Sequence, residues 1–476
     1  MKIIFVASEA IPYAKTGGLA DVTGTLPKHL KKLGVEVSSF LPLYKVIKDK
    51  KIPLLKISSG NLALGGKNFS YSLYKNEDNT VCDTYFIEND ELFFRDELYN
   101  QKGVDFPDNY LRYAFFCRAA LKFIIDSGDS DIIHAHDWQA ALIPVYKKLF
   151  FPERREKVLL TIHNLSYQGI FPPEVLKEID LPEKLFNIEG LEFYGKINFL
   201  KGGILFSDFL NTVSSSYSKE IQTPEFGFGL HDLLLKRRDN LTGIINGIDY
   251  TYWNPENNPF IQVPFSLKTI ERKRENQKFL YQKLGISFDL EKPLLAMVSR
   301  ITSQKGFDIL LDIFPELMKL PLNFIILGTG DLEYENRLKE YAKSYQDRFI
   351  PIIKFDEELS HQIYASSDFF LIPSKFEPCG LTQLIALRYG SIPLVRRTGG
   401  LKDTIQDYHE KTNCGNGLSF DNYNSFELLE IIKRALKIFE NKQVYQQIQK
   451  SGMKCDYSWA SSSQEYCNLY NLIKVK

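Results

Sequence analysis

Short apolar segments alternate with helical stretches along most of the chain, and this alternation limits the possible folds more than any other feature of the sequence. The strands expected in the first half are 3–7, 35–40, 132–134 and 158–162. The strands expected in the second half are 294–299, 324–327, 369–372 and 392–395. Helical spacing of apolar residues predicts helices over 19–33, 307–317 and 381–389. The pattern is typical of α/β domains built on parallel sheets.

The length and one turn-rich region predict the domain organisation. A chain of 476 residues is expected to form two or three domains. The segments 246–249 and 253–259 have the composition of turns rather than of regular structure. We therefore expect one doubly wound domain over 1–245 and a second over 246–458, with a cleft between them.

The charge balance and the cysteines argue against several classes of protein. The chain has 59 Lys and Arg against 59 Asp and Glu, and a net charge of zero gives no global field for nucleic acid or an anionic membrane. The six cysteines form no Cys-x-x-Cys pair, which argues against structural zinc and a disulfide framework and favours a reducing cytoplasm. The chain opens on an expected strand and has no apolar run of about 18 residues, so neither a leader nor a membrane span is expected.

A glycine-containing loop follows the first expected strand. Its sequence, Lys15-Thr16-Gly17-Gly18-Leu19-Ala20-Asp21, opens the first expected helix, and backbone amides at a helix start attract anions. Lys15 would add a positive charge beside a phosphate, although the spacing matches neither a Walker loop nor a dinucleotide fingerprint. A plain glycine-rich turn is the alternative. Five of the six residues at 16–21 recur at 398–403, which predicts similar loop-to-helix turns in both halves.

Polar residues also follow two more of the expected strands in the first half. Asp137 comes after His134 and His136 on one of them, and His163 follows the other. Two histidines separated by one residue occur in metal sites, but no third ligand has a suitable spacing. Asp137 and His163 therefore suit hydrogen bonding to sugar hydroxyls, and the alternative is that the histidines are simply buried and hydrogen-bonded.

Two loops of the second half carry the charges expected of a phosphate site. Arg300 and Lys305 lie on one loop, where a guanidinium fork and an ammonium would neutralise a diphosphate; two solvated cations are the alternative. Glu377 lies on the other loop, as a site residue or as a surface carboxylate. The segment 380–382 would direct its amides and the Thr382 hydroxyl at a phosphate. Cys379 is expected to pack rather than to act as a nucleophile, because no histidine is adjacent in the sequence.

These loops together resemble those of the bacterial glycogen synthases, which are related to the plant starch synthases. The matching segments run in order along nearly the whole chain: 15–21, 134–138, 161–169, 246–249, 299–306, 377–383 and 396–401. The Glu-Pro-x-Gly motif alone is shared by many glycosyltransferases, whereas the ensemble is specific. The resemblance implies a GT-B fold, in which two Rossmann-like domains face each other across a cleft. Because each half would carry part of the site and water must be kept out, closure of the domains is expected to precede chemistry. It also implies that the tail, 459–476, packs back on the N-terminal domain.

The resemblance further implies a reaction. It is a metal-independent, retaining transfer of glucose from ADP-glucose to the non-reducing 4-hydroxyl of an α-1,4-glucan, as in cytoplasmic glycogen synthesis without a cofactor. The residues carried over as catalytic are Glu377, His163, Arg300 and Lys305. The residues carried over as substrate-binding are Lys15, Gly18, Asp21, Asp137, Asn246, Phe355, Cys379, Gly380, Leu381 and Thr382. Phe355 falls where the family has an aromatic residue against the adenine, and Asp108, Asn109 and Arg112 match a segment near the acceptor side.

One departure from the family pattern concerns the donor. After Asn276 the family commonly has Lys, whereas this chain has Gln277, with Lys278 next. If that Lys assists donor binding, this chain does without it or uses Lys278. Two alternatives therefore stay open at this point: a related GT-B transferase with another donor or acceptor, and a paralogue that binds nucleotide sugar or glucan without turnover.

Overall fold

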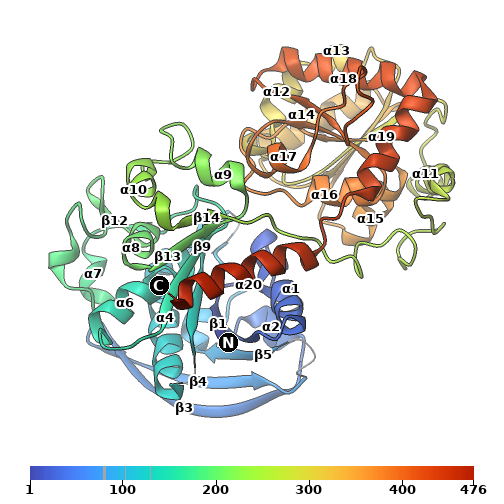
Figure 1. Ribbon diagram of the computed structural model, residues 1–476. Helices are drawn as coiled ribbons and strands as arrows, with labels where there is room; N and C mark the ends of the chain where they lie inside the picture. The colour runs from blue at the N-terminus through green and yellow to red at the C-terminus, as the bar shows by residue number, and fades with distance from the viewer. Residues whose placement is uncertain (79–81, 102, 129, 476) are drawn as a thin grey trace. The chain divides into compact units, whose positions relative to one another are not determined.

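The computed structural model describes residues 1–475 except 79–81, 102 and 129, and it divides into two compact units. Unit 1 comprises Met1–Asn246 and Trp459–Lys476, and unit 2 comprises Gly247–Ser458. The boundary expected after residue 245 lies one residue before the observed one. Each unit contains a sheet of mainly parallel strands flanked by helices (Figure 1), so the predicted α/β class with two Rossmann-like domains is confirmed.

The main sheet of unit 1 has nine strands within the described residues, in the order β14-β13-β9-β8-β1-β2-β5-β4-β3. Their bounds are β1 Lys2–Val6, β2 Glu36–Pro42, β3 Leu54–Leu64, β4 Lys67–Asn76, β5 Asp83–Glu88, β8 Ile132–His136, β9 Lys157–Ile162, β13 Phe209–Thr212 and β14 Leu241–Gly243. Neighbours from β14 to β5 are parallel, whereas β4 is antiparallel to both β5 and β3. The four strands predicted in this half correspond to β1, β2, β8 and β9, and the β3–β4 hairpin adds an edge that the alternation does not predict.

The helices of unit 1 lie between these strands along the chain, except α20, which follows unit 2. They are α1 Gly18–Lys32, α2 Lys45–Asp49, α3 Asp90–Phe93, α4 Asn109–Ser127, α5 Asp137–Ala140, α6 Leu142–Phe150, α7 Val175–Glu178, α8 Phe199–Phe206, α9 Ser215–Glu220, α10 His231–Lys236 and α20 Trp459–Val475. In the part of unit 1 that is described, two small sheets accompany them: β10 Ile170–Phe171 with β12 Lys196–Asn198 and β11 Glu192–Phe193, and β6 Asn100–Gln101 with β7 Val104–Asp105.

The C-terminal helix α20 packs on unit 1 beside α1 (Figure 1). Its buried side chains Trp459 and Tyr466 belong to one core cluster with Phe5 of β1 and Leu26 of α1. Burying an apolar side chain of this size contributes about 1.5–3 kcal/mol. The tail is therefore part of the core of the N-terminal unit, although more than 200 residues of unit 2 precede it in the sequence.

Unit 2 contains a parallel sheet of six strands among its described residues, in the order β17-β16-β15-β18-β19-β20. Their bounds are β15 Leu294–Val298, β16 Asn323–Gly328, β17 Phe349–Ile353, β18 Phe369–Ile372, β19 Ile392–Arg396 and β20 Leu418–Phe420. The helices are α11 Lys273–Leu284, α12 Phe307–Asp312, α13 Phe314–Leu317, α14 Leu332–Ser344, α15 Glu357–Ser366, α16 Thr382–Arg388, α17 Gly399–Thr404, α18 Ser425–Glu440 and α19 Lys442–Lys454. No helix in the described part of the whole chain is both long and apolar enough to cross a bilayer.

The single helix predicted over 307–317 is wrong, because the structure divides it. Helix α12 ends at Asp312, and α13 begins at Phe314. Pro315 cannot donate a backbone hydrogen bond, and its ring disfavours helical backbone at the preceding residue. Proline is tolerated at the start of a helix, so a break just before it resolves the conflict.

Both main sheets reverse their strand order beside their first strand. In unit 1 the chain proceeds from β1 to β2 on one side and later returns to β8 on the other. In unit 2 it proceeds from β15 to β16 and β17, and later returns to β18 on the other side of β15. Ligands of open α/β sheets bind beyond the carboxyl ends of the strands at such switch points. The loops after β1 and β8, and those after β15 and β18, are therefore where a site is expected.

A buried lysine in α11 predicts how the stability of unit 2 depends on pH. Lys273 is 5% exposed, and its ammonium donates to the carbonyl oxygens of Tyr364 at 2.6 Å and Tyr389 at 2.9 Å and to Ser391 Oγ at 3.0 Å. Burial lowers the pKa of Lys273 to about 7. From pH 7 to about 10 the unfolded chain therefore binds a proton that the folded chain lacks, and the free energy of unfolding gains up to about 1.4 kcal/mol per pH unit from this residue.

The Lys273→Met variant should lack this gain. We expect urea unfolding at pH 7, 8 and 9, followed by circular dichroism, to show that the free energy of unfolding of the wild type increases relative to that of Lys273→Met as the pH rises. The matched control is Lys278→Met, because Lys278 lies on the same helix with its side chain exposed. Parallel curves for wild type and Lys273→Met would contradict the assignment.

Candidate active site

An ion pair joins the two loops that flank the switch point of unit 2. Lys305 ends the short 3₁₀ helix Ser303–Lys305 after β15, and Glu377 follows β18. Lys305 Nζ lies 2.5 Å from Glu377 Oε2, which also accepts a hydrogen bond from Ser374 Oγ at 2.9 Å. The side chains are 18% and 8% exposed. A cation and a carboxylate are thus held together where the strand order predicts a ligand.

The other residues predicted for unit 2 follow strands of the same sheet. Arg300 is exposed on the loop that carries Lys305, and Thr382 is the first residue of α16. Cys379 is buried, at 5% exposure, as expected of a packing residue. Phe355 follows β17 and is 79% exposed, so an adenine ring would have access to its face. Gly380 and Leu381 are half-buried directly before α16, and an ion pair joins Lys305 to Glu377.

The backbone of the Glu377 loop is held by the first residues of α17. Gly400 N donates to Glu377 O at 3.1 Å and to Pro378 O at 3.2 Å. Gly399 has a φ of +46°, and a Cβ atom added there would lie 1.9 Å from Glu377 O. A side chain at position 399 would therefore push the Glu377 main chain away from α17, and only glycine fits the observed approach.

We expect Gly399→Ala to lower the free energy of unfolding by about 1–3 kcal/mol and turnover by about tenfold, through overpacking and displacement of Glu377. The recurring motif supplies the control, because Gly17 occupies the equivalent position in the first half. A Cβ atom at Gly17 would meet no atom within 4 Å, and its φ of −157° suits any residue. Chemical denaturation should therefore find Gly17→Ala as stable as wild type, and equal losses in the two variants would refute the argument.

The Lys15 loop of unit 1 differs from its prediction in one respect. Its backbone amides are expected to be open to an anion, but the Glu9 carboxylate accepts hydrogen bonds from Thr16 N and from Gly17 N, the latter at 3.3 Å. Lys15 Nζ lies 2.8 Å from Asp21 Oδ1. The Glu9 carboxylate therefore occupies the loop amides that are expected to bind a phosphate. Gly18, the first residue of α1, and the partly exposed Lys15 stay predicted ligands.

Glu9 is a residue that the sequence reading misses. Besides the two loop amides, its carboxylate accepts hydrogen bonds from Thr16 Oγ1 at 2.7 Å and from Tyr99 Oη at 2.6 Å. Glu9 is 3% exposed. The available signal is its position three residues after β1, at the switch point, because a buried carboxylate needs hydrogen-bond partners.

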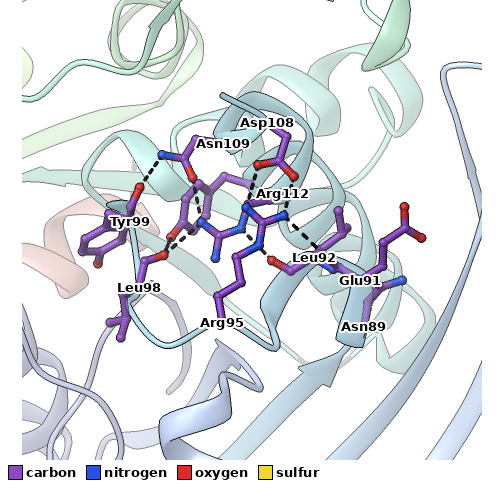
Figure 2. Close-up of polar contacts among 10 residues, drawn as sticks. Asn89, Glu91, Leu92, Arg95, Leu98, Tyr99, Asp108, Asn109 and Arg112 are labelled. Carbon is purple, nitrogen blue, oxygen red and sulfur yellow. Dashed lines mark hydrogen bonds and ion pairs between the residues drawn. The ribbon is translucent and has the colours of Figure 1, made fainter. Parts of the chain in front are cut away.

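The segment matched to the acceptor side is organised by buried arginine (Figure 2). Arg112 is fully buried and donates to Asn109 Oδ1 at 2.6 Å and to two main-chain carbonyl oxygens of the segment before α4. Asn109 in turn donates to Tyr99 O at 2.8 Å. Arg95 pairs with Asp108 through both carboxylate oxygens, at 2.8 and 2.5 Å. Arg112 and Asn109 therefore hold the loop that presents Tyr99.

Asp137 and His163, predicted together, do meet in unit 1. Asp137 Oδ1 accepts a hydrogen bond from His163 N at 2.7 Å. Burial raises the pKa of the Asp137 carboxyl to about 7, against the lowering effect of the backbone hydrogen bonds. Burial also lowers the pKa of His163 to about 3, so this ring is neutral in the physiological range. Asn246 is 4% exposed, and its Oδ1 has no hydrogen-bond partner among the residues that the structure describes.

The comparisons with known proteins agree along the whole chain. A family model described as the starch synthase catalytic domain matches residues 2–236, and one described as glycosyl transferases group 1 matches residues 282–452. A glycogen synthase of Thermodesulfovibrio yellowstonii is 43% identical over 99% of this chain and 97% of its own length. A glycogen synthase of Geotalea daltonii is 44% identical over 100% and 99%.

The chain belongs to the glycogen synthase family. It is therefore a glycosyltransferase. A solved structure supports the same assignment: the catalytic domain of starch synthase IV from Arabidopsis thaliana, bound to ADP and acarbose, is 32% identical with a TM-score of 0.92. That similarity covers 100% of this chain and 99% of the other.

The departure from the glycogen synthase pattern at Gln277 has a structural account. Gln277 is 1% exposed in α11, where its Oε1 accepts from Arg274 at 2.6 Å and its Nε2 lies 3.4 Å from Asp368 Oδ2. Lys278 is exposed. The Gln277 side chain is therefore buried between its own helix and the residue before β18, where its amide hydrogen-bonds to Arg274 and contacts Asp368.

Within the described residues, the two histidines of β8 belong to no cluster of metal ligands. Among the described residues, no group of three or more His, Cys, Asp or Glu side chains is arranged to hold a metal ion. The ring nitrogens of His134 contact Tyr470 Oη and Thr161 Oγ1 at 2.8 and 2.6 Å. His136 Nδ1 contacts His163 Nε2 at 3.0 Å. These ring nitrogens are therefore used in hydrogen bonds within unit 1.

Proposed function

We propose that this chain transfers glucose from ADP-glucose to the non-reducing 4-hydroxyl of an α-1,4-glucan, with retention of the anomeric configuration. The observation that carries the proposal is the Lys305–Glu377 ion pair, with 2.5 Å between Nζ and Oε2, at the switch point of unit 2. It supplies a cation for a departing diphosphate beside a carboxylate for a positively charged sugar. The related starch synthase structure with ADP and acarbose supports the choice of nucleotide and of a saccharide ligand.

Unit 2 is assigned to the leaving group. Breaking the bond between glucose and phosphate builds negative charge on ADP, which Arg300 and Lys305 stabilise as fixed cations. The amides at Gly380 and Leu381 and the Thr382 hydroxyl add hydrogen-bond donors, and Phe355 offers its exposed face to the adenine. Charge stabilisation by these groups does the work that a metal ion does in other phosphate chemistry.

Unit 1 is assigned to the sugar and to part of the phosphate. Asp137, His163 and Asn246 are buried or half-buried polar groups suited to the hydroxyls of the transferred glucose. Lys15 exchanges Asp21 for a phosphate oxygen when donor binds, and Gly18 allows the backbone to approach. In this scheme Glu9 keeps the loop in shape through Thr16 and Gly17.

Retention of configuration follows from attack on the same face from which the diphosphate leaves. The acceptor 4-hydroxyl forms the new bond to the anomeric carbon as the bond to phosphate breaks, and a departing phosphate oxygen takes the hydroxyl proton. Glu377 faces the oxocarbenium-like sugar and stabilises its charge. The products are ADP and a glucan one glucose longer, so atoms and charge balance.

The test is incorporation of labelled glucose into glycogen, with ADP-glucose and UDP-glucose compared in the presence of EDTA. We expect incorporation from ADP-glucose that EDTA leaves unchanged and that β-amylase releases as maltose. Preferred use of UDP-glucose would overturn the donor assignment. Tight binding of ADP-glucose without any product would instead support a non-catalytic paralogue.

We also propose a cytoplasmic location. All six cysteines, including the exposed Cys414 and the half-buried Cys82, Cys455 and Cys467, are free thiols. Accessible thiols persist in a reducing compartment and pair in an oxidising one. Fractionation of cells that express the protein, with glycogen recovered in the same fraction, tests the location.

A further inference from the structure

Three histidine rings lie in a row at the switch-point edge of the unit 1 sheet. His134 and His136 project from β8 with ring centroids 4.1 Å apart, and the His136 and His163 centroids are 5.3 Å apart. All three are buried, and desolvation holds the pKa of each well below its ordinary value. Each neutral ring carries one N–H donor and one acceptor nitrogen. Which nitrogen holds the proton is therefore decided by the neighbouring hydrogen bonds.

The proton of His134 is fixed by a chain of donors. Asn211 Nδ2 donates to Thr242 O, which orients the amide so that Asn211 Oδ1 accepts from Thr161 Oγ1 at 3.0 Å. Thr161 has thus used its proton, and its oxygen accepts from His134 Nε2 at 2.6 Å. Tyr470 Oη then donates to His134 Nδ1 at 2.8 Å. His134 is the Nε2–H tautomer.

The contact between His136 and His163 permits two arrangements. His136 Nδ1 and His163 Nε2 are 3.0 Å apart, so one of them donates. His136 Nε2 is buried and has no hydrogen-bond partner in the described part of the chain. If His163 donated, His136 would bury an N–H on Nε2 without an acceptor, which folded proteins rarely tolerate. If His136 donates, Nε2 keeps only a lone pair without a partner. The Phe5 ring packs beside His136, with 5.0 Å between the two ring centroids.

We propose that His136 is a positioning residue: it donates from Nδ1 to His163 Nε2 and so fixes His163 as the Nδ1–H tautomer, which presents a donor to a substrate oxygen. His163 Nδ1 has no hydrogen-bond partner among the described residues, and it is not a fully buried atom. It therefore accounts for part of the 8% exposure of His163. A donor there suits a sugar hydroxyl oxygen. The catalytic consequence rests on the proposed glucosyl transfer; the tautomer does not.

The tautomers are measured directly in the unliganded full-length protein. Long-range ¹H–¹⁵N correlation of ¹⁵N-histidine-labelled enzyme distinguishes Nδ1–H from Nε2–H rings among the seven histidines. We expect Nε2–H for His134 and Nδ1–H for His136 and His163, assigned through the resonances lost in His134→Gln and His136→Asn. An Nε2–H ring at His163, or no Nδ1–H ring in the wild-type spectrum, overturns the proposal whether or not the variants fold.

Two substitutions separate positioning from packing. His136→Asn keeps an N–H donor at the same bond distance from Cβ as Nδ1, whereas His136→Leu removes it. His163 in His136→Leu should revert to the Nε2–H form that imidazole favours in water, with kcat about 10–100-fold lower and KM for ADP-glucose little changed. The kcat of His136→Asn should stay within about threefold of the wild-type value, because the Asn side chain still donates to His163 Nε2. The kcat of His134→Gln should stay within the same range, because His136 is unchanged in that variant.

The outcomes are distinguishable from failure of the proposed function. A wild type with the expected tautomers but without glucosyl transfer refutes the function and leaves the tautomer assignment standing. Glucosyl transfer with His163 in the Nε2–H form refutes this inference alone. An unchanged kcat in His136→Leu, or equal losses in the Asn and Leu variants, removes His136 from the positioning role.

Discussion

Glu377→Ala should reduce kcat by about 100- to 1000-fold while KM for ADP-glucose changes by less than about threefold. The carboxylate, 8% exposed and fixed by Lys305 and Ser374, is preorganised to stabilise positive charge that exists only as the sugar departs. Removing a group of this kind raises the barrier without weakening donor binding. Initial-rate kinetics over a range of ADP-glucose concentrations measure the split. A variant that shows only a higher KM contradicts the role.

Lys305→Ala should lose both turnover and stability. It removes a cation from the leaving group and leaves Glu377 without its ion-pair partner. Breaking a buried pair by removing one partner costs about 3–5 kcal/mol, and because the Lys305 side chain keeps 18% exposure, we expect about 2–3 kcal/mol. The double variant with Glu377→Ala should recover much of the stability, because no carboxylate is stranded, and none of the activity.

A surface ion pair of the same length serves as the control. Lys283 Nζ lies 2.5 Å from Glu358 Oε1, but these side chains are 48% and 52% exposed. An exposed pair contributes about 0–1 kcal/mol, so Lys283→Ala should keep the turnover and nearly all the stability. Near-normal turnover in both Lys305→Ala and Arg300→Ala would remove these residues from the phosphate site.

The strands of the two parallel sheets are predictable because each is a short, continuous apolar run. The segment 369–372 is predicted and observed with the same bounds, and the strand at 324–327 extends by one residue at each end. The β3–β4 hairpin escapes prediction because β3 is mostly exposed or half-buried, is fully buried only at Leu62 and Leu64, and carries several polar residues. The turn at Gly65–Gly66, where both residues have positive φ, is the available signal.

The predicted site divides in the same way. Lys305 and Glu377 are 72 residues apart, yet each follows an apolar strand. The sequence therefore predicts that both lie at the same edge of the sheet. Glu9 and the direction of the His136–His163 hydrogen bond are not predictable in this way, because they depend on partners far along the chain, such as Tyr99. Strand ends can be found from local pattern, whereas the orientation of a buried polar side chain is set by the complete network around it.

Asp137→Asn should make the protein more stable above neutral pH and at least about 100-fold slower. Asp137 has a φ of +55°, a conformation that asparagine also accepts, and its Oδ1 accepts from His163 N at 2.7 Å, which an amide oxygen can also do. The substitution therefore keeps the backbone and the hydrogen bond from His163 N, and it removes the charge. Loss of that charge and of one acceptor oxygen weakens contact with the sugar in the transition state.

The sign of the stability change follows from the raised pKa. The folded carboxyl has a pKa of about 7 against an ordinary value of 3.8, chiefly because of burial. The favourable contribution of the neutral acid is complete below pH 3.8 and is lost as pH rises to 7; above that, the folded state bears the cost of a desolvated carboxylate. Because Asp137 keeps part of its surface exposed, we expect about 1–3 kcal/mol in favour of Asp137→Asn at pH 8 and little difference at pH 4.

Urea unfolding at pH 4 and pH 8 with activity at pH 8 tests both halves, and Asp137→Ala is the control. Alanine removes the charge too, but it forfeits the acceptor for His163 N and tolerates positive φ poorly, so it should be less stable than Asp137→Asn at both pH values. An Asn variant that is no more stable than wild type at pH 8 would show that Asp137 is not strained by its charge. An Asn variant with full turnover would show that the charge is not kept for catalysis. Gain of stability together with loss of rate is expected where a buried charge is retained for the reaction rather than for the fold.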